Sequence, residues 1–244
     1  RRASSNVTPG PSSCSKGTVL GNMNGSSWAW MISVGVEIFD RNCRACPRLA
    51  GFLDEVNERY PDYYCRPVPP FGDMNARFLI VGLAPGMHGA NRTGRPFTGD
   101  HAGILLYRML HKYGFGSQDH SESAADDLEL IDCRITNAVK CLPPDNKPVG
   151  VEINTCNEFL VNELRLLRKD SVVMALGGIA HRAIIKAMGL RQADYKFGHA
   201  ALHELGDFQV LDSYHCSRYN TNTGRLTEAM FDAIFAQARE LLDK

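Results

Sequence analysis

The sequence RFLIVGLAPGMHGANRTGRPFTGDHAGILL, residues 77–106, contains a strand, a turn, a polar loop and the start of a helix. Its apolar run at 78–81 has the length and β-branched content typical of a buried strand. The glycines and proline at 82–86 end that strand, because glycine permits a sharp turn and proline lacks a backbone donor. From residue 104 the apolar spacing predicts a helix. Since open α/β sheets bind ligands at the carboxyl ends of their strands, this loop is the first candidate site.

Three later segments extend the pattern. Strands are predicted at 133–140, 171–176 and 208–211, and helices at 156–167, 179–188 and 226–242. Alternation of strands and helices predicts an α/β fold, a three-layer α/β/α sandwich with a short, mostly parallel central sheet. Residues 59–75 and 116–127 are expected to be irregular, and His181 is expected to be structural.

Length and composition favour one domain with an unstructured tail. Of 244 residues, 44% are hydrophobic, enough for one sizeable core, which we place at 28–244. Residues 1–27, rich in Ser, Gly and Asn, are expected to be a disordered extension. No apolar run reaches the length of a membrane span, so no membrane partner is expected. Lys+Arg and Asp+Glu both number 27, so nucleic-acid binding would require a local basic face.

The cysteines indicate a metal site. Eight cysteines without a secretory signal suggest a reducing, cytoplasmic compartment and thiols available for metal. A CxxC pair places two thiolates within reach of one metal centre. Ligand count alone leaves zinc as an alternative to an iron–sulfur cluster. The CxxC pair in this chain is Cys43 and Cys46, and the other cysteines are Cys14, Cys65, Cys133, Cys141, Cys156 and Cys216.

Three segments resemble motifs of the family 5 uracil-DNA glycosylases, the iron–sulfur branch of the uracil-DNA glycosylase superfamily. They are GLAPGMHGANRTGRPFTGD at 82–100, ITNAVKCLPPDNKP at 135–148 and YHCSRYNTNTGRLT at 214–227. With the cysteine pattern, the resemblance covers most of the chain. It implies a uracil-DNA glycosylase-like fold and a [4Fe-4S] cluster, and its cysteine pattern makes Cys43, Cys46, Cys141 and Cys156 the predicted metal ligands. The other four cysteines are predicted to be buried free thiols. The implied activity is DNA repair: hydrolysis of the N-glycosidic bond of uracil, and of other deaminated or damaged bases, in double-stranded DNA.

The resemblance also implies roles for residues in the base pocket. Asn137 would read the base edge, since an amide offers one acceptor and two donors. His215 would donate a hydrogen bond to the developing negative charge on uracil O2, and Phe97 would supply a stacking face. The other predicted pocket residues are Gly82, Ala84 and His88.

The first motif departs from much of the superfamily at Ala84. Other branches carry there an Asp or Asn that activates water, which alanine cannot do. Asp100, at the end of the motif, is therefore the candidate for positioning water or countering charge on the sugar. Asp before a helix is also an ordinary N-cap, and we weigh the two roles evenly. Asn137 and His88 are further candidates for binding the water. The predicted catalytic residues are Asp100, Asn137 and His215.

The expected partner is double-stranded DNA containing uracil or another damaged base, bound by a monomer in a bacterial or archaeal cytoplasm. Phosphate contacts are predicted for Arg92, Arg95, Lys140 and Arg218, and Tyr219 with Arg218 is predicted to fill the gap left by an extruded base. Two other function classes remain open. One is a non-catalytic iron–sulfur protein that binds damaged DNA. The other is a nucleotide-binding α/β enzyme, against which the incomplete glycine fingerprints argue.

Overall fold

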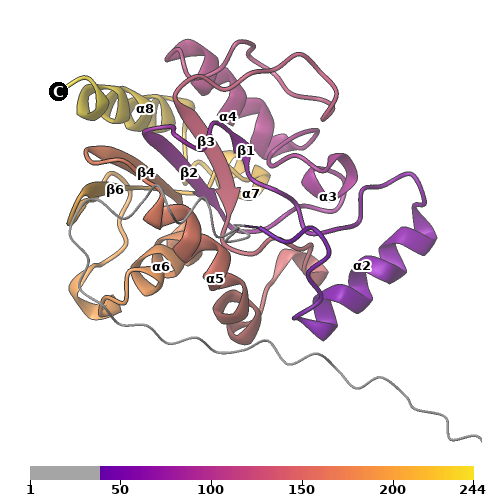
Figure 1. The fold of residues 1–244 in the computed structure, drawn as a ribbon. Coiled ribbons are helices and arrows are strands. Elements are labelled where there is room, and N and C mark those ends of the chain that lie inside the picture. Colours follow the sequence, from indigo (N-terminus) through magenta and orange to yellow (C-terminus); the bar gives the residue numbers. More distant parts are fainter. Residues whose placement is uncertain (1–38) are drawn as a thin grey trace, which may run out of the picture. The chain divides into compact units, whose positions relative to one another are not determined.

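A computed structural model describes residues 39–244 (Figure 1). The predicted extension at 1–27, residues 28–38 of the predicted domain and Cys14 lie outside the described residues. Within 39–244, no helix combines the length and the apolar character required to cross a membrane.

Six strands form one sheet in the order β1-β3-β2-β4-β6-β5. The four central strands are parallel to one another, and each outer strand is antiparallel to its neighbour, which confirms the prediction of a mostly parallel sheet. Every residue of β2 and β4 is buried, because these apolar strands are covered on both faces. The strands are β1 (Phe71–Gly72), β2 (Phe78–Gly82), β3 (Cys133–Asn137), β4 (Ser171–Leu176), β5 (Leu202–Leu205) and β6 (Phe208–Ser213).

Helices cover both faces of this sheet (Figure 1). Alternate residues of β2 point to opposite faces: Phe78 and Ile80 pack with α4 and α8, whereas Leu79 and Val81 pack with α5 and α6. The predicted three-layer arrangement is thereby confirmed. The helices are α2 (Pro47–Arg59), α3 (Ala90–Thr93), α4 (His101–Lys112), α5 (Gly150–Arg165), α6 (Gly178–Ala187), α7 (Arg218–Asn222) and α8 (Glu228–Leu242), with short 3-10 turns η2 (Pro144–Asn146) and η3 (Gln192–Asp194).

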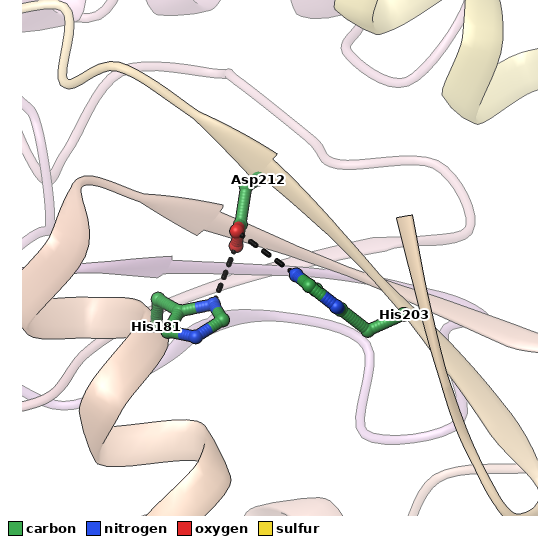
Figure 2. A group of neighbouring side chains, drawn as sticks. All are labelled: His181, His203 and Asp212. Atoms are coloured by element: carbon green, nitrogen blue, oxygen red, sulfur yellow. Dashed lines mark hydrogen bonds and ion pairs between the residues drawn. The ribbon is translucent and has the colours of Figure 1, made fainter. Parts of the chain in front are cut away.

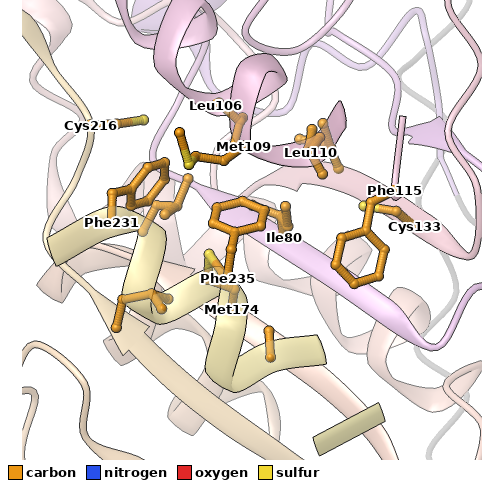
Figure 3. Close-up of a cluster of buried hydrophobic side chains, with 14 of the residues drawn as sticks. Ile80, Leu106, Met109, Leu110, Phe115, Cys133, Met174, Cys216, Phe231 and Phe235 are labelled. Carbon is orange, nitrogen blue, oxygen red and sulfur yellow. The ribbon is translucent and has the colours of Figure 1, made fainter. Parts of the chain in front are cut away.

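The larger core cluster lies between the sheet, α4 and α8 (Figure 3). Aromatic rings fill much of it, with the Phe78 and Phe115 centroids 4.6 Å apart and the Phe231 and Phe235 centroids 5.1 Å apart. Two predicted buried thiols, Cys133 and Cys216, belong to this cluster and are fully buried, as expected. Cys65 is half-buried.

The structure corrects several predicted boundaries. Helix α5 begins at Gly150, six residues before the expected start, because the Glu152 carboxylate accepts a hydrogen bond from the backbone N–H of Val149 (2.8 Å) and caps the first turn. The segment 59–75 was predicted to be irregular, but it contains the short strand β1, which pairs with β3. Strand β5 was not predicted either, because as an edge strand it is largely exposed and lacks an apolar run.

Replacing Phe235 by alanine would test the core between sheet and helices. The ring is fully buried and packs edge-on against Phe78 at 6.0 Å, so its removal leaves a cavity. We expect Phe235→Ala to lower the free energy of unfolding by about 3–5 kcal/mol, measured by urea denaturation. Glu240→Ala, at an exposed position of the same helix, is the control and should change it by less than about 0.5 kcal/mol. Equal midpoints for the two variants would contradict this account of the core.

Candidate functional site

The three motifs meet at one cavity of about 1050 Å³ at the carboxyl ends of the central strands. The parallel registers produce this meeting, because Gly82 lies opposite Asn137 and Leu176 lies opposite Ser213. The loops that follow β2, β3, β4 and β6 therefore emerge side by side. Among the residues predicted from sequence, those that line the cavity are Ala84, His88, Phe97, Asp100, Asn137, Arg218 and His215.

Asn137 and Phe97 lie in the depth of the cavity against Gly82. Both side chains are buried, and a Cβ atom on Gly82 would stand 2.7 Å from Phe97 Cζ and would overlap Asn137 Oδ1. Only glycine therefore permits this packing. The Asn137 amide makes no hydrogen bond to another side chain or backbone group of residues 39–244, so its acceptor and donors are free for a ligand.

His215 lies over Phe97, with ring centroids 5.9 Å apart and an interplanar angle of 29°. Its backbone oxygen accepts a hydrogen bond from Asn220 Nδ2 (2.8 Å), which ties the loop to α7. The Nδ1 atom is buried and has no hydrogen-bond partner within the described part of the chain. Burial lowers the pKa of His215 to about 4, so the imidazole is neutral at pH 7. A neutral ring donates from one nitrogen only.

Asp100 takes the N-cap role weighed from the sequence, and one of its carboxylate oxygens stays outside that cap. Its Oδ1 atom accepts a hydrogen bond from the backbone N–H of Gly103 (2.9 Å), so the residue is the N-cap of α4. Its other oxygen faces the turn at 86–89, where a Cβ on Gly86 would lie 3.6 Å from Oδ2 and a Cβ on Gly89 would overlap it. Burial raises the pKa of Asp100, and hydrogen bonds from the α4 backbone partly oppose that shift.

His88 belongs to an aromatic group at the rim of the cavity. The rings of Tyr60 and Tyr63 stack at 4.7 Å, and His88 meets both of them edge-on. The Tyr63 hydroxyl lies 2.9 Å from His88 Nδ1, within hydrogen-bond distance. His88 itself is exposed, whereas Ala84 is half-buried and packs against the small cluster of Leu49 and Val139.

Two of the predicted phosphate-binding side chains are instead buried. Arg95 forms an ion pair with Asp126, and its Nη2 donates to the backbone oxygen of Ala124 (2.9 Å). Lys140 Nζ lies 2.5 Å from Glu163 Oε1, and both side chains are almost completely buried. Since neither cation reaches the surface, the prediction that Arg95 and Lys140 contact DNA is wrong.

The other predicted DNA contacts lie at or near the surface. Arg92 is half-buried, and its Nε donates to the backbone oxygen of His88 (2.8 Å). Arg218 is exposed at the start of α7 and lines the cavity. Tyr219 follows it with 72% of its surface exposed, unusual for a tyrosine that no partner covers within the described residues.

The wall formed by 119–122 was not identified as part of the site from the sequence. Its residues line the cavity next to the first motif, and the buried Arg95 of that motif donates to Ser121 Oγ (3.1 Å). The backbone N–H of Gly99 also donates to the Ser121 oxygen (3.0 Å), which fixes this wall beside Asp100. In the sequence this segment looks like a solvated acidic loop. Its role in the site depends on the buried Arg95 that holds it, and nothing in the sequence around Arg95 predicts that burial.

The four predicted metal ligands surround a second, smaller cavity of about 80 Å³. Cys43 and Cys46 precede and cap α2, Cys141 follows β3, and Cys156 lies in α5. Burial raises the pKa of Cys46 and Cys141, and raises that of Cys156 to about 11, so without a cation these thiols stay protonated. Four soft sulfur donors around one small space suit zinc or an iron–sulfur cluster.

Most of the chain is similar in sequence to known proteins. It matches the sequence model of the Uracil DNA glycosylase superfamily over residues 69–239. It is 47% identical over 205 residues to the Type-5 uracil-DNA glycosylase of Thermus thermophilus, covering 82% of this chain and 93% of the relative. It is 44% identical over 190 residues to the Type-5 uracil-DNA glycosylase of Pyrobaculum aerophilum, covering 76% and 83%. The Type-4 uracil-DNA glycosylase of Thermotoga maritima is 31% identical over 178 residues, covering 72% and 77%.

The lowered pKa of His215 predicts how stability depends on pH. An unfolded histidine titrates near 6.5 and the folded His215 near 4, so between these values only the unfolded chain binds this proton. The contribution of His215 to stability therefore decreases as pH falls from about 6.5 to 4. We expect His215→Gln to flatten that decrease, measured by urea unfolding over a pH series. His111→Gln, at an exposed position outside the cavity, is the control; identical slopes for His215→Gln and wild type would refute the prediction.

Proposed function

The chain belongs to the uracil-DNA glycosylase superfamily, and we propose that it is a monofunctional glycosylase that removes uracil from double-stranded DNA. The observation that carries the proposal is the single cavity that unites Phe97, Asn137 and His215 at the strand ends. A base inside a duplex cannot enter such a cavity, so the target nucleotide must be extruded from the stack. The product would be an abasic site, from which base excision repair proceeds.

In this proposal the base is recognised at the bottom of the cavity. Phe97 offers its ring as a stacking face for the planar base. The unengaged amide of Asn137 pairs with uracil O4 and N3–H, because it presents an acceptor and donors together. Cytosine presents an amino group and an unprotonated nitrogen at these positions, which reverses the hydrogen-bond pattern.

His215 would assist departure of the base. The bond between C1′ and the base nitrogen breaks with its electron pair remaining on uracil, so negative charge develops on O2 while the sugar becomes cationic. A neutral imidazole donates a hydrogen bond to that oxygen without the proton transfer that a charged ring would favour. His215 Nδ1 is shielded from solvent, so little water would compete with a hydrogen bond from this side of the ring.

Asp100 would act on the sugar side. Its Oδ1 is occupied as the N-cap of α4, which leaves Oδ2 facing the turn at 86–89. Water adds to C1′ and loses a proton, which this carboxylate can accept, while its charge stabilises the cationic sugar. The raised pKa of Asp100 makes it a better proton acceptor, and the position replaces the acidic side chain that Ala84 lacks.

Hydrolysis without strand cleavage agrees with the residues around the cavity. Lyase chemistry needs a nucleophilic amine, and among residues 39–244 the cavity lining contains no lysine. Lys140, the lysine nearest in sequence to Asn137, is buried in its ion pair with Glu163. The alternative, a non-catalytic iron–sulfur protein that binds DNA damage, would need the same cavity but not its polar side chains.

We further propose that Arg92 and Arg218 contact phosphates beside the lesion and that Tyr219 fills the gap in the duplex. Arg218 is exposed and lines the cavity, Tyr219 follows it at an exposed position, and Arg92 is half-buried beside the cavity residue His88, which supports this assignment. The same proposal includes that the protein acts on double-stranded DNA as a monomer and that it also removes other deaminated bases. It further includes a cytoplasmic location, because the DNA of a bacterial or archaeal cell lies in the cytoplasm.

We also propose that the four cysteines hold a [4Fe-4S] cluster. Their position around one small cavity supports it, as does the backbone N–H of Lys140, which donates to Cys156 Sγ (3.2 Å) in the manner of cluster hydrogen bonds. A bound cluster would supply a covalent link between α2, α5 and the end of β3. The hydrolysis requires no electron transfer, so the role of this link is structural.

Excision of uracil tests the proposed function directly. Purified protein is incubated with a duplex containing one uracil, and abasic sites are detected by alkali-dependent strand cleavage under single-turnover conditions. We expect Asn137→Ala and His215→Ala each to reduce the rate by about 10²–10³-fold, because each removes a hydrogen bond to the departing base. Absence of cleavage by the wild type with its metal site loaded would favour the damage-binding alternative.

Asp100 requires variants that separate its two roles. Asp100→Ser keeps an oxygen that caps the helix but removes the carboxylate, whereas Asp100→Ala removes both. We expect both variants to lose excision, and only Asp100→Ala to lose about 0.5–2 kcal/mol of stability in urea unfolding. Asp207→Ala, at an exposed carboxylate on a turn, is the matched control. Wild-type rates for Asp100→Ser would show that the residue only caps α4.

Metal analysis tests the cluster independently of activity. We expect iron and acid-labile sulfide in equal amounts in the purified wild type, with both reduced to trace levels in Cys156→Ser. Cys65→Ser, at a half-buried cysteine outside the ligand set, should retain them. Stoichiometric zinc without iron or sulfide would instead assign a zinc site.

A further inference from the structure

A buried group of two histidines and a carboxylate lies outside the cavity and takes no part in the proposed chemistry (Figure 2). His181 comes from the first turn of α6, His203 from β5 and Asp212 from β6. His181 is 1% exposed and Asp212 is fully buried. An ionisable group so deep in the protein requires a compensating partner.

The hydrogen bonds of His181 determine its protonation. Its Nε2 lies 2.9 Å from the backbone oxygen of Tyr195, and its Nδ1 lies 2.8 Å from Asp212 Oδ1. A carbonyl and a carboxylate oxygen only accept hydrogen bonds, so each needs a donor on the facing ring nitrogen. A neutral imidazole has only one N–H, and the unprotonated nitrogen would face an acceptor at hydrogen-bond distance. Both contacts are satisfied together only when the ring carries two protons and a positive charge.

The charges around the ring agree with this assignment. Burial opposes a charge on His181, and so does the neighbouring Arg182 on α6. The hydrogen bonds to Asp212 on β6 and to the Tyr195 backbone favour the charge, and the pKa of His181 is raised overall. From β5, His203 Nε2 lies 3.2 Å from the second carboxylate oxygen, to which the backbone N–H of Gly198 also donates (3.3 Å). Asp212 therefore has donors on both oxygens.

We propose that His181 is a protonated positioning residue, whose ion pair with Asp212 fixes the end of β6 that presents His215 to the cavity. Asp212 lies three residues before His215, and the backbone N–H of Gly177 donates to the Ser213 oxygen between them (2.8 Å). The backbone N–H of His181 in turn donates to the Gly177 oxygen (3.1 Å). Two connections thus join the start of α6 to the strand end, one through side chains and one through the backbone.

The approach of the two segments is close at this point. Gly177 adopts φ of 94°, and a Cβ on it would lie 3.5 Å from His215 Cβ. A displacement of the strand end would therefore move His215 relative to Phe97 and the base. Since misplacement of a reacting group by about 1 Å costs up to about 10²-fold in rate, the ion pair acts on catalysis without touching substrate.

A metal ion could also be held by these three side chains, because one ligand atom from each lies within 4.8 Å of the others. The observed distances favour a protonated His181 over a bound metal ion. Each carboxylate oxygen already faces a histidine nitrogen at hydrogen-bond distance, and Asp212 Oδ2 also accepts from the Gly198 backbone. A metal ion would have to break these contacts.

Nitrogen-15 NMR of the wild-type side chains tests the charge on His181 without reference to activity. We expect both ring nitrogens of His181 to be protonated at neutral pH, and only one in Asp212→Asn, in which the attracting charge is removed. With its raised pKa, the proton is retained at low pH and is lost as pH rises. A neutral His181 in the wild type, or one equivalent of zinc that is lost in His203→Ala, would overturn the proposal.

The positioning role rests on the proposed function and is tested by rate. We expect Asp212→Asn and His181→Gln to slow single-turnover excision about ten- to a hundredfold, with the KM for uracil duplex unchanged. Asp194→Asn, in the exposed ion pair with Arg191 on the neighbouring turn, is the matched control and keeps the wild-type rate. Wild-type rates for Asp212→Asn would overturn the positioning role. An inactive wild type with a doubly protonated His181 would refute the glycosylase function and leave the charge assignment standing.

Discussion

The site depends on the close contact of β2 with the end of β3. Parallel register places Gly82 opposite Asn137, and the missing side chain of Gly82 is the space that Asn137 and Phe97 occupy. Any other residue at 82 would push the amide and the ring out of the cavity. Because the neighbouring pairs of strands are also parallel, all the loops that carry polar residues leave the same edge of the sheet. The sheet therefore determines which residues meet, and a glycine determines how closely they meet.

Buried charges hold the surrounding loops in place. Arg95 ties Ser121 and Asp126 to the first motif, Lys140 joins β3 to α5, and His181 joins α6 to β6. Burying an ion costs several kcal/mol unless it is paired and hydrogen-bonded, and each of these cations has a carboxylate partner. These cations are consequently lost to DNA binding, and the local basic face that a neutral protein needs must come from fewer residues, with Arg92 and Arg218 as the candidates near the surface.

The sequence predicted the central strands, the three-layer arrangement and the meeting of the motifs at one edge of the sheet. It could do so because buried parallel strands are continuous apolar runs, and here they end near glycines. Edge strands and burial of individual charges did not follow from the sequence. Strand β5 has the composition of a surface segment, and its pairing with β6 depends on residues far from it. Arg95 and Lys140 sit among motif residues, and nothing local distinguishes a cation facing a phosphate from one facing Asp126 or Glu163. For Asp100 the sequence left two roles open; the fold shows the N-cap, and the second carboxylate oxygen faces the turn at 86–89, where the proposed role on the sugar side would be carried out.

His215, just after β6, and His181, at the start of α6, show how the fold assigns different chemistry to the same side chain. His215 is half-buried and its Nδ1 atom is buried without a partner within the described residues, so desolvation alone acts on it and keeps it neutral. His181 is 1% exposed, but Asp212 and a backbone oxygen compensate the cost of burial and favour the charged form. A carboxylate partner would favour the charged ring at His215 as well, whereas the proposed mechanism needs a neutral donor there. In that mechanism the two histidines have separate tasks: the charged His181 fixes the end of the strand, and the unpartnered His215 faces the base.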